Sequence, residues 1–132
     1  MARWGGARDF TTTPGLQIRI FGGSMIQYKE GCNTAHISGP CWHAIRTFDR
    51  ILRWYTHDID TVVTEVNAVT GHKDGSLHYA GSAVDFRDRH IKDKQWFNRF
   101  MGGLRNELGP AGFECHQEDT HIHVEFDPQR TK

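Results

Sequence analysis

Residues 41–69 read CWHAIRTFDRILRWYTHDIDTVVTEVNAV and join a helical pattern to a strand pattern. The apolar residues of Cys41–Tyr55 recur at three- and four-residue steps, which is the spacing of one face of an amphipathic helix. Thr61–Val69 is rich in Val and Thr and lacks Gly and Pro, which indicates a strand at the centre of a sheet. A helix beside such a strand predicts an α+β domain.

Shorter patterns on both sides of this segment extend the predicted sheet and helix layer. Alternating apolar residues predict strands at Gln17–Phe21 and His121–Phe126, and we expect another strand at Ser82–Arg87. Apolar residues at helical spacing predict a second helix over Asp93–Leu108, whereas Ser24–Pro40 has turn residues and little regular structure. We therefore expect a small antiparallel sheet with two helices on one face.

Length and charge limit the classes of protein to which this chain can belong. With 132 residues, we expect a single domain over residues 17–132, preceded by a flexible arm over residues 1–16. The 16 Lys and Arg residues balance the 16 Asp and Glu residues, which argues against nucleic acid or a membrane as partner. The N-terminus lacks the apolar stretch of a secretory signal. We expect a monomer that is cytoplasmic at synthesis.

The histidine content invites a search for a metal site, because histidine is a common metal ligand. In the last predicted strand, period-two geometry puts His121 and His123 on one face. Zinc in catalytic sites takes three ligands from His and carboxylate side chains and leaves one position for water. His78, Asp85 and one of His121 or His123 would supply such a set.

Two motifs give these residues a specific context, although chance alone yields about 0.6 His-x-His pairs in a chain of this composition. The stretch SLHYAGSAVDF (residues 76–86), followed by HIHVEF (residues 121–126), resembles the family of zinc D-alanyl-D-alanine carboxypeptidases and phage L-alanyl-D-glutamate endopeptidases. The family pattern is Ser-x-His-x-x-Gly-x-Ala-x-Asp and then His-x-His in a C-terminal strand. Every fixed position is present here, and the match covers roughly the second half of the chain.

The resemblance implies a fold, a cofactor and a set of ligands. Lysostaphin-type enzymes and the hedgehog signalling domain share this fold, in which a zinc cleft lies on the sheet face opposite the helices. One zinc ion per chain would be held by His78, Asp85 and His123, and His121 would polarise the substrate carbonyl. Ser76 would support the loop that presents His78 and help to bind substrate.

The general base is where the sequence departs from the family pattern. Many relatives carry Glu or Asp three residues before the last ligand histidine, and Thr120 occupies that position here. A slip of one residue in the turn would bring Glu118 or Asp119 to the water instead. A base must lie within hydrogen-bond reach of the water that it activates, and we favour Glu118.

The arginine that relatives use to bind the substrate carboxylate is also replaced. The segment that ends in His72 and Lys73 takes its place, so Lys73, His72 or Arg87 would supply the cation. Both a carboxypeptidase and an endopeptidase specificity therefore remain open.

The resemblance implies a hydrolase of peptidoglycan stem peptides. The small size, the absence of a signal and the family likeness point to a bacteriophage endolysin or a virion-associated enzyme, which degrades the cell wall after release. The main alternative is a non-catalytic zinc domain, or a phage structural protein, that uses the cleft to bind a partner. Thr120 is the feature that favours this alternative.

Three further groups of residues have both a functional and a structural interpretation. Cys32, His36, Cys41 and His43 could bind a second zinc ion, but they lack a Cys-x-x-Cys spacing, so we expect reduced thiols and surface imidazoles. Cys115 is better interpreted as a core residue than as a nucleophile. The aromatic residues of the two predicted helices are expected mainly in the core; they are Trp42, Trp54, Trp96 and Phe100.

Overall fold

The computed structural model describes residues 8–13, 16–21, 24–32, 37–67 and 82–127, with side chains from residue 26 onward. These residues form seven strands and two α-helices, and a short 3₁₀ helix, η1 (Gly109–Ala111), follows the second α-helix. In chain order they are β1 (Arg8–Thr13), β2 (Leu16–Phe21), β3 (Ser24–Lys29), α1 (Gly39–Tyr55), β4 (Thr61–Asn67), β5 (Ala83–Arg87), α2 (Phe97–Leu108), β6 (Phe113–Gln117) and β7 (His121–Phe126).

The strands form one sheet in the order β1-β2-β3-β4-β5-β7-β6, which places β4 at the centre as predicted. The expectation of a small, fully antiparallel sheet is wrong, because the sheet has seven strands and β3 runs parallel to β4. All the other neighbouring strands are antiparallel. The parallel pair arises because α1 connects β3 to β4 and returns the chain to the end from which β3 started.

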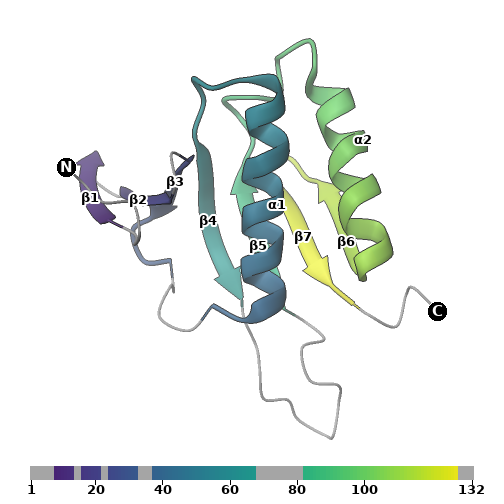
Figure 1. Cartoon of the computed structure of the whole chain (residues 1–132), viewed down its shortest axis with the longest axis horizontal. Helices are drawn as coiled ribbons and strands as arrows, with labels where there is room; N and C mark the ends of the chain where they lie inside the picture. Colours follow the sequence, from purple (N-terminus) through teal and green to yellow (C-terminus); the bar gives the residue numbers. More distant parts are fainter. Residues whose placement is uncertain (1–7, 14–15, 22–23, 33–36, 68–81, 128–132) are drawn as a thin grey trace, which may run out of the picture.

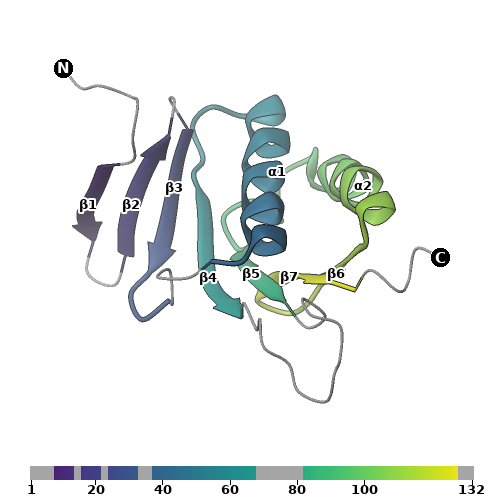
Figure 2. The ribbon, with the colours of Figure 1, turned by 60° about the horizontal axis from the view of Figure 1, so that its bottom comes forward.

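Both helices lie on the same face of the sheet, so the predicted α+β layering is confirmed (Figure 1). They cover the half of the sheet that contains β4, β5, β7 and β6, whereas β1, β2 and β3 extend past α1 (Figure 2). The core lies between the helices and this half of the sheet, and it also includes Ile26 and Tyr28 of β3. Neither described helix combines the length and the apolar character that are needed to cross a bilayer.

Local sequence explains where α1 begins and how it packs. The Ser38 hydroxyl accepts a hydrogen bond from the Cys41 amide (3.2 Å), and Pro40 lies in the first turn, where its missing N–H is not needed. The helix buries its apolar face on the sheet, where Phe48 stacks on Phe86 with ring centroids 3.9 Å apart. An aromatic pair at this spacing adds to the free energy gained by burial.

Four elements differ from their sequence-based predictions. The expected flexible arm contains β1, which pairs with β2, and the expected turns over Ser24–Pro40 contain β3. The second helix begins at Phe97 instead of Asp93, because Lys92 and Lys94 make turn hydrogen bonds to Asp88 and Ile91. No strand was predicted at β6, which forms the edge of the sheet beside β7.

Candidate metal site

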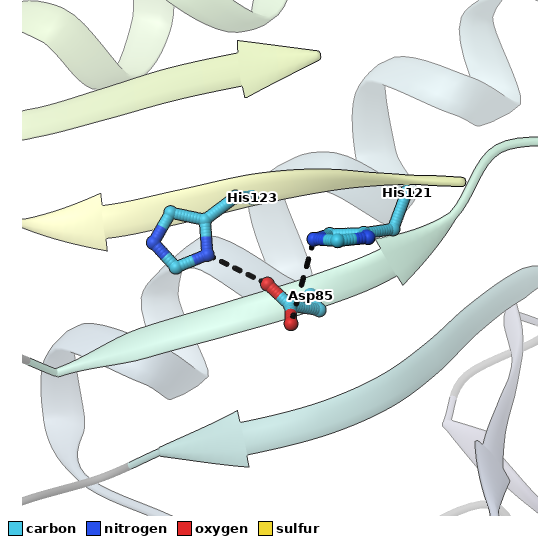
Figure 3. A group of neighbouring side chains, drawn as sticks. All are labelled: Asp85, His121 and His123. Atoms are coloured by element: carbon cyan, nitrogen blue, oxygen red, sulfur yellow. Dashed lines mark hydrogen bonds and ion pairs between the residues drawn. The ribbon is translucent and has the colours of Figure 1, made fainter. Parts of the chain in front are cut away.

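Asp85, His121 and His123 form a group on the sheet face that points away from the helices (Figure 3). One potential ligand atom from each residue lies within 4.8 Å of those of the other two. Asp85 comes from β5, and the two histidines come from the neighbouring strand β7. This is the one such group among the described residues, and it includes Asp85 and His123, two of the three predicted ligands.

The sheet register brings these side chains together. Asp85 lies directly opposite His123 in the β5–β7 pair, and Arg87 lies opposite His121. Residues that are paired in an antiparallel sheet share a face, and so do residues two apart in one strand. Ile122 and Val124 alternate with the histidines and are buried in the core, which fixes the face that the histidines occupy.

The ring of His123 is held between two carboxylates. Its Nδ1 donates to Asp85 Oδ1 (2.7 Å), and its Nε2 donates to Glu125 Oε1 (3.2 Å). Partial burial acts to lower the pKa of His123, but the hydrogen bonds and charges of Asp85 and Glu125 outweigh it, so the pKa is raised. Both nitrogens can donate at once only in the protonated ring, and a metal ion must displace one of these protons.

The ring of His121 is also held on both sides. Its Nε2 lies 2.9 Å from Glu118 Oε1 and 3.7 Å from Asp85 Oδ2, and its Nδ1 lies 3.2 Å from the Thr120 hydroxyl. The Glu118 carboxylate therefore contacts a member of the group, and its role as general base stays a prediction. The interaction described for Asp119 is a hydrogen bond from Lys92 Nζ to its backbone oxygen.

The donors suit a metal ion in both type and spacing. Imidazole nitrogen and carboxylate oxygen are ligands that zinc and other transition metals accept. Ligand atoms of a tetrahedral zinc shell lie about 3.3 Å apart, and the shortest separations within this group bracket that value. The side chains of Asp85, His121 and His123 are 20%, 28% and 26% exposed, so an ion from solvent can reach them. The group can therefore hold a metal.

The other predicted site residues divide into two sets. His78, Lys73, Ser76 and His72 lie outside the described residues, so their predicted roles stay predictions. Arg87 is described, is partly exposed and lies two residues from Asp85 on the same face. Sequence reasoning assigned His121 to the substrate carbonyl, whereas the structure also makes it a potential ligand. Strand alternation places His121 on the same face as His123, which is compatible with His121 as a metal ligand or as a donor to the substrate carbonyl.

Cys41 and Cys115 are both buried. Cys41 is buried and donates through Sγ to the Ala83 carbonyl (3.5 Å), while His43 is exposed on another side of α1, so these two do not converge on one ion. His36 lies outside the described residues. Burial raises the pKa of Cys115 to about 11, which suppresses the thiolate that a nucleophile needs and fits its place in the core.

The aromatic residues follow the prediction with one exception. Phe100 is fully buried, and Trp42 and Trp96 pack against the core, but Trp54 is 83% exposed.

Comparison with known proteins identifies no relative. The chain matches no family model, no curated protein and no solved structure. The case for a function therefore rests on the residues of the site and on their geometry.

Proposed function

We propose that the protein is a zinc-dependent metallopeptidase that hydrolyses peptide bonds in the stem peptide of peptidoglycan. The observation that carries the proposal is the group Asp85, His121 and His123, with the Glu118 carboxylate 2.9 Å from His121. The group supplies potential metal ligands, and the nearby Glu118 carboxylate is the candidate for the general base of the proposed reaction. The sequence motifs around residues 76–86 and 121–126 connect this chemistry to peptidoglycan.

The proposed roles follow from the chemistry of each side chain. His78, Asp85 and His123 would hold the ion, with His121 as a further potential ligand. When bound, zinc polarises a carbonyl and lowers the pKa of a water molecule to about 7. Glu118 would accept the proton of the attacking water, and His121 would donate a hydrogen bond to the carbonyl oxygen as negative charge develops there.

Glu125 would position His123. A carboxylate that accepts a hydrogen bond from one nitrogen of a ligand histidine fixes the ring and increases its basicity. In this chain, Glu125 contacts Nε2 and Asp85 contacts Nδ1. Glu125 is thus suited to hold the ring when Nδ1 faces the ion.

The scissile bond depends on where a substrate carboxylate can bind. Arg87 is a cation on the same face as the group and is paired in register with His121, so it is the described candidate for a carboxylate anchor. Lys73 and Ser76 complete the proposed substrate-binding set. A D-Ala-D-Ala carboxypeptidase and an L-Ala-D-Glu endopeptidase are both consistent with this proposal. In either case we propose a phage-derived endolysin or virion component that acts on the cell wall.

The test combines metal content with hydrolysis. We expect about one zinc per wild-type chain by elemental analysis and loss of the metal in Asp85→Ala and His123→Ala. Wild type should digest purified peptidoglycan, and these two variants should not. His116→Ala is the matched control, because His116 pairs with His123 in register but lies outside the group. Mass spectrometry of the products separates release of D-Ala from an internal cut. A metal-free wild-type protein with unchanged stability in chelator would refute the proposal.

A second candidate is a zinc domain without catalysis that binds a partner through the same face. Thr120 favours it, because a threonine stands at the position where many members of the resembled family carry the base. This candidate predicts full zinc content together with no hydrolysis of any stem peptide. If the protein is instead a phage structural protein with an incidental histidine cluster, we expect neither bound zinc nor hydrolysis.

A further inference from the structure

A groove of about 970 Å³ lies between α1 and β3. It is lined by Trp42, Arg46, Arg50 and Arg53 of the helix and by Ile26 of β3. Since α1 covers one sheet face (Figure 1) and the candidate metal site lies on the other (Figure 3), a ligand in this groove would leave the metal site open. The groove has no part in the proposed hydrolysis.

Two arginines of the groove are able to bind an anion. Arg46 is exposed, and it has no ion pair within the part of the chain that the structure describes. Arg50 lies one turn further on the same side of the helix and pairs with Glu107 (2.7 Å), with side chains 60% and 49% exposed. An ion pair this exposed contributes little to stability, so Arg50 can exchange Glu107 for a stronger anion.

Asp49, the acidic residue that lines the groove, does not neutralise the charges of Arg46 and Arg50. Asp49 is buried, accepts a hydrogen bond from the Thr61 hydroxyl (2.8 Å) and pairs with Arg53 Nε (3.4 Å). Arg53 also donates to the Ile59 carbonyl, so Asp49 and Arg53 form a fixed pair in the wall. The cations that face solvent are therefore Arg46 and Arg50.

The charges of the two helices and of the sheet half beneath them favour the same ligand. The exposed charged residues of the two helices are Arg46, Arg50, Arg99, Arg105 and Glu107. The charged residues on the open face of β4, β5, β6 and β7 are Glu65, Asp85, Arg87, Glu114 and Glu125. The helix layer therefore attracts an anionic polymer more strongly than the opposite face does.

We propose that this groove binds an anionic cell-wall polymer in which phosphodiester groups repeat along a sugar or polyol chain. Residues four apart in a helix are about 6 Å apart along its axis, so Arg46 and Arg50 can contact successive phosphates. Guanidinium binds phosphate through paired hydrogen bonds. Trp54, one turn beyond Arg50, offers an exposed aromatic surface for the chain between phosphates. The choice of a wall polymer over other polyanions rests on the proposed function.

The test is co-sedimentation with purified cell walls, before and after their phosphodiester polymers are removed with acid. The protein is Glu118→Gln, which is expected to bind metal without digesting the wall. Arg46→Glu with Arg50→Glu should weaken binding at least about tenfold, because each charged hydrogen bond contributes about 1.5 kcal/mol or more. Arg99→Glu, an exposed charge reversal on α2, is the matched control and should bind as before. Thermal melting of each variant checks its folding.

The outcomes separate this proposal from the proposed function. Equal binding to stripped walls, unchanged binding by the double variant, or tighter binding to DNA than to walls at about 0.15 M salt would each overturn the groove proposal. With Glu118 restored, the double variant should hydrolyse a soluble stem peptide at the wild-type rate. Failure of wild type to cleave that peptide would count against the peptidase alone.

Discussion

His123 is the residue whose ionisation connects the site to the stability of the fold. Burial opposes its positive charge, but Asp85 and Glu125 on either side outweigh burial and raise its pKa. A group whose pKa is raised on folding stabilises the protein fully below its unfolded pKa of about 6.5, and this contribution is lost as pH rises through the folded pKa. Bound metal reverses the trend, because the ion competes with the proton.

We therefore expect the metal-stripped protein to gain more free energy of unfolding from His123 at about pH 6 than at about pH 8. NMR titration of the histidine ring should give a pKa above the ordinary value. Glu125→Gln should lower that pKa and reduce the pH dependence of urea unfolding. A His123 pKa that is the same in wild type and in Glu125→Gln would contradict the role of this carboxylate.

Under the proposed function Glu118 is the general base, so a variant of this residue distinguishes a catalyst from a metal-binding domain without catalysis. Glu118→Gln keeps the size of the side chain and a hydrogen-bonding group near His121, so we expect the metal content to stay unchanged. Loss of a general base typically reduces turnover by about 10²–10⁴-fold. Steady-state hydrolysis of a stem peptide measures this effect.

Asp119→Asn is the control for Glu118→Gln, because the contact described for Asp119 involves its backbone and not its carboxylate. It should retain nearly full activity. If Asp119→Asn is the slower of the two variants, the assignment of the base is wrong.

Among the elements, α1 packs on the sheet through several buried side chains, of which Phe48 is the aromatic one. Phe48 is 1% exposed, stacks on Phe86 and makes an edge contact with Phe100 of α2, with centroids 5.0 Å apart. It therefore connects both helices to β5. We expect Phe48→Ala to lower the free energy of unfolding by about 3–5 kcal/mol, because the side chain is lost and a cavity remains.

Denaturant unfolding measures the effect of Phe48→Ala, and Trp54→Ala provides the contrast on the same helix. Trp54 is the exposed large apolar side chain of α1, so its removal should change the free energy of unfolding by no more than about 0.5 kcal/mol. Equal losses in the two variants would mean that α1 does not pack as described.

The elements that the sequence predicted well are those whose own residues contain the pattern. α1, β4, β5 and β7 lie within a few residues of their predicted bounds, because each buries one face and alternates accordingly. β1 and β3 depend on their neighbours. β1 has the sequence RDFTTT, with little apolar alternation, and it forms a strand by pairing with β2. Turn residues around β3 concealed a strand that β2 and β4 hold from both sides.

The parallel pairing of β3 and β4 was not predicted, because the strand β3 itself was not predicted. A strand, a helix and a strand in succession generally form a parallel unit. The sequence predicted a strand at Gln17–Phe21 before the helix but none at β3, so the strand that pairs in parallel with β4 was missing from the prediction.

For the whole molecule, a bound ion would connect β5 and β7 and so stabilise the half of the sheet that the helices cover. A ligand that binds only the folded state adds about 2.7 kcal/mol at a free concentration of 100 times its Kd, which for a chain of this size raises Tm on the order of 10 °C. We expect zinc to raise Tm, chelator to reverse the rise, and His123→Ala to abolish it. Scanning calorimetry measures this shift.

The His116→Ala control should keep the full zinc-dependent shift in Tm. If zinc raises Tm equally in His123→Ala and in wild type, the ion binds somewhere other than this group.

The balanced overall charge of the sequence does not show how charged residues are distributed between the two faces of the folded molecule. The sequence balances 16 basic residues against 16 acidic ones, which argued against a polyanionic partner. Folding places Arg46, Arg50, Arg99 and Arg105 on the helix layer and most of the described carboxylates of the covered half-sheet on the opposite face. An averaged charge therefore says little about which partner one face of a protein attracts.

The sequence by itself indicated the α+β class and the central strand, because hydrophobic periodicity is a local property of the chain. The choice of Asp85 and His123 came from two motifs that resemble a known family, and motif spacing is local as well. Only the tertiary structure decided that Glu118 and Glu125 hold the two histidines, that His121 joins the potential ligands, and that the arginines of α1 share a groove. These contacts depend on strand register and on the packing of layers. Both are set by burial between residues far apart in the chain, which no local pattern records.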